Sequence, residues 1–320
     1  MPRVNKGVLY LSSGALCYSL GSLSFSKSGA QSSQINTWVG LIAIPVCILI
    51  LSLNTHFSPF SRRRSPDLYL SILNGFLFGG AAIYLHFWSL EYLLPSDNNM
   101  VVVAFFICSS VVFQIIEEKR MPSILTFASV LLGILGTFFV CNPTDLFTKN
   151  ILELDNIKGV CLVALAGISF GFLYSSVRRY NSVPPVWICL GAAFGNLASG
   201  LTSYNPWSDA SMQSCDLFPR ILALMASVFQ STTLCSNLTG VMETGVTVTA
   251  AAVIQLLSPV FSFLLQLVLF PHIVWWRSGV GILSIILAVM VQLRVLKKRE
   301  KEIAKSQVIR SCLTEDIQLV

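Results

Sequence analysis

Long blocks of apolar residues dominate the chain, and they show neither the stripe of an amphipathic helix nor the alternation of a strand. Blocks of about 18 or more apolar residues are typical of membrane spans. Such spans are helices, because backbone groups in lipid must be hydrogen-bonded within the chain. The predicted spans are 7–26, 35–53, 68–90, 98–116, 123–141, 158–177, 185–201, 217–238, 247–270 and 273–294. We therefore expect an all-α, polytopic membrane protein of about ten transmembrane helices.

The composition supports this interpretation, since 54% of the 320 residues are hydrophobic and only 11% are charged. A soluble chain of this length carries about twice that charge. The longest connecting segments, 142–157 and 202–216, leave no room for a soluble domain. Any chemistry is therefore expected within or beside the bilayer, and both the plasma membrane and the Golgi or another endomembrane remain open as its location.

The net charge of +6 raises the possibility of a nucleic-acid partner, but the positions of the basic residues favour another explanation. With a cytoplasmic N-terminus, 16 of the 21 lysines and arginines fall on the inside, seven of them between Arg294 and Arg310. This is the positive-inside distribution of membrane proteins. It predicts that both termini are cytoplasmic, that membrane lipids are partners, and that nucleic acid is not.

A short internal repeat divides the chain into two halves. The stretch from Ser109 to Pro122 matches that from Ser258 to Pro271 at an offset of 149, and Gly133 matches Gly281 at an offset of 148. Each half then holds about five spans, and an odd number requires the second half to enter the membrane inverted. Inverted repeats are typical of secondary transporters, in which two halves rock about a central site.

Several motifs resemble the drug/metabolite transporter superfamily with its EamA-type repeats. The run SLEYLLPSD from Ser89 leads into an apolar span, a glutamate pair at 117–118 closes that span, and the next has a GxxG pattern from Gly133. In the second half, the run from Thr247 to Pro259 is similar to the partner repeat, although Ser110 stands at the position that matches Pro259. The pattern is most similar to solute carrier family 35, especially its group G.

The resemblance implies two EamA-like five-helix repeats, at 1–150 and 151–296, followed by a cytoplasmic tail at 297–320 that we expect to be disordered. It also implies a central cavity lined by spans one, three, four, six, eight and nine. Within spans, polar side chains are candidates for function because they are costly in hydrocarbon. The predicted substrate-binding residues are Tyr84, His86, Asn98, Asn99, Gln230, Asn237, Thr247 and Gln255. Of these, Tyr84, Asn98, Gln230 and Gln255 are expected to meet in one cavity.

Each of these residues also has a purely structural explanation, because Asn, Gln and Thr join membrane helices by bonds worth about 1 kcal/mol or less. His86 is either a proton site or a packed neutral histidine. Asn196, in span seven, is a weaker candidate because the resemblance does not assign that span to the cavity. Glu243 is the only acid between spans eight and nine, so it is a candidate for coupling transport to protons or cations, with a solvated loop acid as the alternative.

Signatures of enzymes and of bound cofactors are missing from the sequence. It contains no P-loop or HExxH motif, and its nine cysteines form no CxxC pair, so no enzyme activity, metal or cofactor is expected. The predicted function is movement of a small organic solute by alternating access. A neutral, zwitterionic or cationic solute is favoured, because the phosphates of a nucleotide sugar would require buried Lys or Arg. Nucleotide-sugar exchange, a non-transporting receptor or scaffold, and a lipid-modifying enzyme are the alternatives, and the oligomeric state stays open.

Overall fold

The computed structural model describes residues 3–53, 66–93, 95–119, 121–141, 154–180, 183–202, 217–242, 246–269 and 276–318. These ranges are helical apart from short turns, and they contain no strand. The first part holds α1 (Arg3–Ser28), α2 (Ser32–Leu53), α3 (Pro66–Asn74), the π-helix η1 (Gly75–Gly80), α4 (Ala81–Ser89), α5 (Pro95–Glu118) and α6 (Ile124–Cys141). The second holds α8 (Leu154–Ser176), the 3₁₀ turn η2 (Val177–Tyr180), α9 (Pro185–Leu201), α10 (Leu217–Met242), α11 (Val248–Gln255), α12 (Leu257–Leu269) and α13 (Trp276–Gln318).

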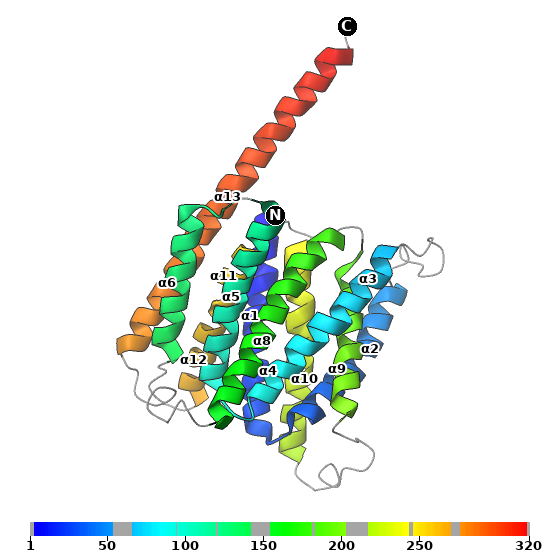
Figure 1. Cartoon of the computed structure of the whole chain (residues 1–320), viewed down its shortest axis with the longest axis vertical. Coiled ribbons are helices and arrows are strands. Elements are labelled where there is room, and N and C mark those ends of the chain that lie inside the picture. The colour runs from blue at the N-terminus through cyan, green and yellow to red at the C-terminus, as the bar shows by residue number, and fades with distance from the viewer. Residues whose placement is uncertain are drawn as a thin grey trace.

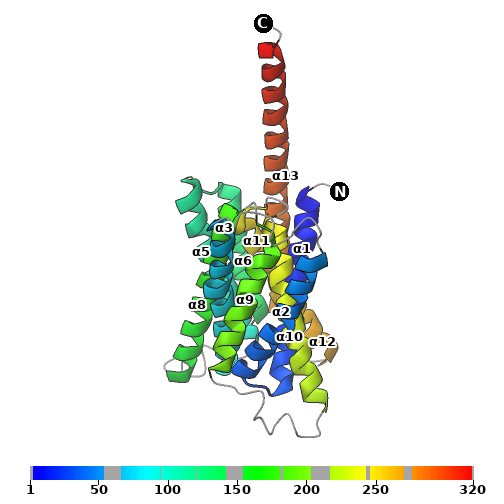
Figure 2. The ribbon, with the colours of Figure 1, turned by 90° about the vertical axis from the view of Figure 1, so that its right-hand side faces the viewer.

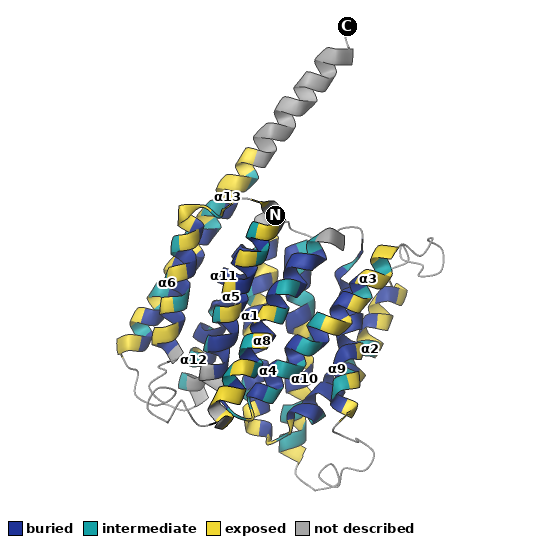
Figure 3. Ribbon diagram, viewed as in Figure 1, coloured by how far each residue is buried: buried dark blue, intermediate teal, exposed yellow. Residues whose placement is uncertain are grey.

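Within these ranges, eight helices are long and apolar enough to cross a membrane, and α6 and α9 are shorter apolar helices. One of the eight is the continuous run α3–η1–α4, and another is the run from α11 into α12. Exposed positions lie along the outer helices of the bundle (Figure 3). Many of the exposed residues are large and apolar, among them Leu49, Leu131 and Leu283. An exposed apolar surface of this extent fits a lipid environment. The fold is therefore that of a multi-pass membrane protein.

The helices lie side by side in one bundle (Figure 1). The main packing partners are distant in sequence: α1 packs against α10, α2 against α9, α5 against α8, and α6 against α13. The start of α1 and the projecting end of α13 lie at the same end of the bundle (Figures 1 and 2). Elements of the first half thus interlock with elements of the second.

The C-terminal segment corrects one expectation from the sequence. We predicted a disordered tail from Lys297, but α13 continues without a break to Gln318 and projects beyond the bundle (Figure 2). The physical reason is that residues 297–318 contain neither proline nor glycine and include many good helix formers such as Lys, Glu, Ala and Leu. A helix that is already formed in the bundle also removes the cost of nucleating a new one.

Proline explains the single break within the run of α11 and α12. Pro259 has no N–H for the carbonyl of Gln255, and its ring crowds that carbonyl, so the helix is interrupted at Leu256. The matching position in the first half is Ser110, and α5 passes through it without interruption. The two matching helices therefore differ in shape, because only one of them contains the proline.

Glycines allow two of the helix crossings to be unusually close. A Cβ on Gly75 would overlap the carbonyl oxygen of Ile188, so η1 and α9 touch through their backbones. Gly167 faces the carbonyl of Val102 on α5 in the same way, and Gly171 faces Ser109. Gly75 and Gly79, like Gly167 and Gly171, stand at small-xxx-small spacing in the sequence, which permits such close contact between helices.

We expect Gly75→Ala to destabilise the protein, although alanine is the better helix former. The added methyl group must push α9 away from η1, and overpacking of this kind costs about 1–3 kcal/mol. Thermal unfolding of purified protein in detergent measures the effect as a lower midpoint. The matched control is Gly279→Ala, since a Cβ there has nothing within 4 Å. Equal midpoints for the two variants would contradict this account of the crossing.

Candidate functional site

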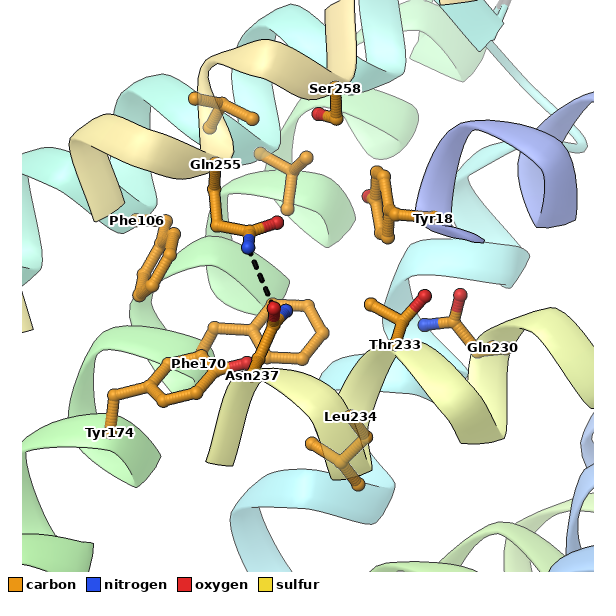
Figure 4. A pocket seen from close by; sticks show the side chains of 12 residues that line it. Tyr18, Phe106, Phe170, Tyr174, Gln230, Thr233, Leu234, Asn237, Gln255 and Ser258 are labelled. Carbon is orange, nitrogen blue, oxygen red and sulfur yellow. Dashed lines mark hydrogen bonds between the residues drawn. The ribbon is translucent and has the colours of Figure 1, made fainter. Parts of the chain in front are cut away.

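A buried cavity lies at the centre of the bundle, where α1, α5, α8, α10 and the α11–α12 break meet (Figure 4). Its wall is apolar and aromatic on one side and carries amides and hydroxyls on the other. Both halves of the sequence contribute to it. The lining residues are Tyr18, Val102, Val103, Phe106, Phe170, Tyr174, Gln230, Thr233, Leu234, Asn237, Gln255 and Ser258.

Two side-chain amides form the polar centre of this wall. Gln255 Nε2 donates to Asn237 Oδ1 at 2.7 Å and to the backbone carbonyl of Leu11 at 2.9 Å. The hydroxyl of Tyr174 lies beside Asn237 in Figure 4. Gln255 is the last residue of α11, so the break caused by Pro259 sets its position. The amide pair joins α10 to α11, and the bond to Leu11 adds α1.

Other polar atoms of the wall are left without a protein partner. Gln230 Oε1 and Ser258 Oγ are buried, with both residues about 1% exposed, and neither accepts or donates a hydrogen bond within the described chain. A buried polar group in this state costs about 1–3 kcal/mol. Because both residues line the cavity, a molecule that enters it can supply the missing bonds.

Tyr18 is held at the edge of the cavity by a histidine behind it. The Tyr18 hydroxyl lies 2.8 Å from His86 Nδ1, and His86 Nε2 lies 3.4 Å from Ser22 Oγ. His86 is fully buried and does not itself line the cavity. Its contacts orient the Tyr18 ring, so the histidine acts on the cavity only through the tyrosine.

The cavity is narrow in this conformation, and every residue that lines it is buried. The space between its atoms amounts to about 420 Å³, but only about 30 Å³ of it can hold the centre of a water-sized molecule. That is room for roughly two waters. No lining side chain carries a charge. An organic solute could enter only after the helices move apart, and it would meet hydrogen-bonding and aromatic groups rather than ions.

Three of the predicted substrate-binding residues, Gln230, Asn237 and Gln255, come together in this cavity. Of the four residues expected to meet there, Gln230 and Gln255 do so, whereas Tyr84 and Asn98 lie elsewhere. Tyr84 is partly exposed and packs against Trp88 at a ring-centre distance of 5.6 Å. Asn98 donates to Ser89 and, at 3.3 Å, to the carbonyl of His86. The bonds of Asn98 join α5 to the end of α4.

The remaining predicted residues make structural contacts outside the cavity. Asn99 Nδ2 donates to Ser262 Oγ at 3.2 Å, which joins α5 to α12. Thr247 caps α11, because its hydroxyl accepts from the backbone N–H of Ala250 at 3.2 Å. Glu243 lies outside the described residues. Substrate binding by the eight residues stays a prediction.

Several lining residues were missed in the sequence. Tyr18, Tyr174, Phe106 and Phe170 look like ordinary apolar residues of spans, and Ser258 looks like a small packing residue. One signal was available: tyrosines buried within spans need a partner for the hydroxyl, so they point to polar neighbours. The aromatic residues give no comparable signal, because their direction depends on the rotation of each helix.

Comparisons with known proteins add information on the fold but not on the family. No family model and no curated protein matches the chain. Among solved structures 28 chains match, and one of them, described only as a crystal structure of a protein, has a TM-score of 0.65. The match covers 89% of this chain and 96% of that one at 17% identity. The chain therefore shares its overall fold with a solved protein over nearly its full length.

The amide pair predicts a measurable coupling between Gln255 and Asn237. We expect Gln255→Leu and Asn237→Leu each to lower the free energy of unfolding, and the double variant to lose less than their sum. The coupling should be about 0.6 kcal/mol and at most about 1.7, as for other hydrogen bonds between membrane helices. Unfolding in mixed micelles measures all four proteins, and strictly additive losses would refute the bond.

Proposed function

We propose that this protein is a secondary transporter that moves a small organic solute across a membrane by alternating access. In this proposal it has ten spans, arranged as two inverted five-helix repeats of the EamA type, and both termini are cytoplasmic. The observation that carries the proposal is the narrow central cavity, built from both halves, whose wall holds Gln230 and Ser258 with unpartnered polar atoms. A polar site in the middle of the bundle, at the interface between two halves, is where a transporter of this kind binds its substrate.

Matching contacts in the two halves support the inverted repeat. Ser109 Oγ donates to the carbonyl of Gly167 at 3.4 Å, and Ser19 Oγ donates to the carbonyl of Ser258 at 2.8 Å. The offset of 149 relates Ser109 to Ser258, and Ser19 and Gly167 are separated by 148. Each bond connects the first helix of one half to the fourth helix of the other. The two bonds thus join positions that the repeat relates, with the donor hydroxyl on the fourth helix in one bond and on the first helix in the other.

The chemistry of the wall favours an uncharged solute within the predicted class of neutral, zwitterionic and cationic metabolites. Amides and hydroxyls can donate to and accept from a polar molecule, and the rings of Tyr18 and Tyr174 can pack against its apolar part or against a cation. No lysine or arginine lines the cavity to bind phosphates. A nucleotide sugar is therefore the less favoured substrate, and it would need basic residues that move in from elsewhere.

A receptor or scaffold that kept a transporter fold is the second candidate. A helical membrane bundle is equally compatible with that role, and a receptor would bind its ligand through the same polar atoms. A lipid-modifying enzyme would require an acid, base or nucleophile set, and no charged residue lines the cavity. Transport is preferred because both halves of the chain contribute to the wall, as in transporters built from inverted repeats.

We expect Gln230→Leu to reduce transport about five- to 150-fold while the protein stays folded. Metabolite profiling of cells with and without the protein first identifies the solute, and uptake into proteoliposomes then gives kcat/KM. Loss of a hydrogen bond to the bound solute costs about 1–3 kcal/mol, which corresponds to this range. The control variant is Gln292→Leu. Gln292 is as buried as Gln230, but it accepts a hydrogen bond from Ser129 and joins α13 to α6, away from the cavity.

Gln292→Leu should keep transport near the wild-type rate even if it lowers stability. Equal rates for the Gln230 and Gln292 variants would remove the cavity from the mechanism. If reconstituted protein moves none of the metabolites that change in the cells, the receptor or scaffold candidate takes its place.

The coupling role proposed for Glu243 has its own test. An acid between spans eight and nine is costly unless it meets water, a proton or a cation. Glu243→Gln keeps the shape and removes the charge, so we expect net uptake to fall or to lose its dependence on pH at normal protein abundance. Wild-type rates across the pH range would instead identify Glu243 as a solvated loop acid.

A further inference from the structure

A second cavity lies to one side of the central one, between α2, α9 and α10. The space between its atoms amounts to about 810 Å³, of which about 240 Å³ can hold the centre of a water-sized molecule. It is thus much roomier than the central cavity in the same conformation. Leu234 contributes to both walls and separates the two spaces.

The rim of this second cavity is apolar and faces the outside of the bundle. Val46 on α2 is 47% exposed and Val228 on α10 is 46% exposed, and both line the cavity. They belong to two helices that are apolar enough to cross a membrane. No lining residue is charged. An opening of this kind leads to lipid tails rather than to water or to charged headgroups.

Deep in this cavity, one amide has no partner. Asn196 on α9 is 1% exposed, and neither its Nδ2 nor its Oδ1 is hydrogen-bonded within the described chain. The other polar groups of the wall are already bonded: Ser231 Oγ donates to the Ser227 carbonyl and Thr232 Oγ1 to the Val228 carbonyl. Asn196 therefore lines an apolar cavity with one unused donor and one unused acceptor.

We propose that this cavity binds an uncharged membrane lipid with a hydroxyl head, such as a sterol, and that the hydroxyl hydrogen-bonds Asn196. A hydroxyl both donates and accepts, so it matches the two unused atoms of the amide. A charged headgroup would find no counter-charge, and a plain acyl chain would leave the amide unsatisfied. The site is separate from the central cavity, and lipid binding there does not depend on solute transport.

The test uses purified protein in phosphatidylcholine nanodiscs that contain a photoreactive, clickable cholesterol analogue. Labelled peptides should come from α2, α9 and α10. Cholesterol should compete for labelling about five- to tenfold better than 5-cholestene, which lacks the hydroxyl, because an unpaired buried amide is costly. In Asn196→Leu this difference should disappear, and the two competitors should act equally.

A matched pair of variants separates the cavity from general contact with lipid. Val46→Trp fills the rim and should reduce labelling at least fivefold. Val112→Trp, at a residue 52% exposed on α5 and outside both cavities, should label like wild type. Equal competition by cholestene in the wild type shows that the hydroxyl is not recognised and overturns the proposal. Equal labelling of the two tryptophan variants also overturns it, even if Asn196→Leu does not fold.

Discussion

In an apolar bundle, every polar group must find its hydrogen-bond partner within the protein, and the structure depends on this constraint. It makes the backbone helical, since a helix satisfies its own N–H and C=O groups. It also explains why buried side chains are joined in pairs across helices. Asn74 donates to Ser176 at 2.6 Å, and Ser129 donates to Gln292 at 2.9 Å. Among the exceptions, Gln230, Ser258 and Asn196 line cavities, whereas others such as Asn36 and Ser110 do not.

The two cavities differ in what surrounds their polar atoms. The central one is enclosed by five spans, and its amides and hydroxyls stand beside four aromatic rings, which suits a polar organic molecule. The lateral one has apolar rims that face outward and a single unpaired amide, which suits a lipid. Because Leu234 belongs to both walls, a movement of α10 that enlarges one space also changes the other. Both proposed ligands would therefore contact α10.

The helix crossings allow such movement without exposing backbone groups. At the contacts of η1 with α9 and of α8 with α5, glycines bring the backbones together without long side chains in between. A contact of this kind has little interdigitation to undo when helices slide. The interruption at Leu256 is a second place for movement, because the angle between α11 and α12 can change where the helix is broken. The close crossings depend on glycines, and the interruption depends on Pro259.

The sequence by itself determined where the helices are, because the thickness of the hydrocarbon layer fixes the length of an apolar block. Every predicted span coincides with described helix to within a few residues, except at the C-terminus, where α13 continues past the predicted end at 294 to Gln318. The close glycine contacts could also be predicted, since small residues at intervals of four permit them whatever the partner helix is. Among the candidate site residues, Gln230, Asn237 and Gln255 were found because a side-chain amide in hydrocarbon costs free energy, so an amide within a span stands out in the sequence.

Only the tertiary structure decided which polar groups meet. The rotation of each helix turns Tyr84 toward Trp88 and Tyr18 toward the cavity, and the break before Pro259 directs Gln255 to Asn237. Asn196 looked like a weaker candidate than Asn98, yet Asn98 is bonded to neighbouring helices and Asn196 is not. The sequence shows that a side chain is polar and within a span. Its hydrogen-bond partner depends on contacts between helices far apart in the chain, which no local pattern records.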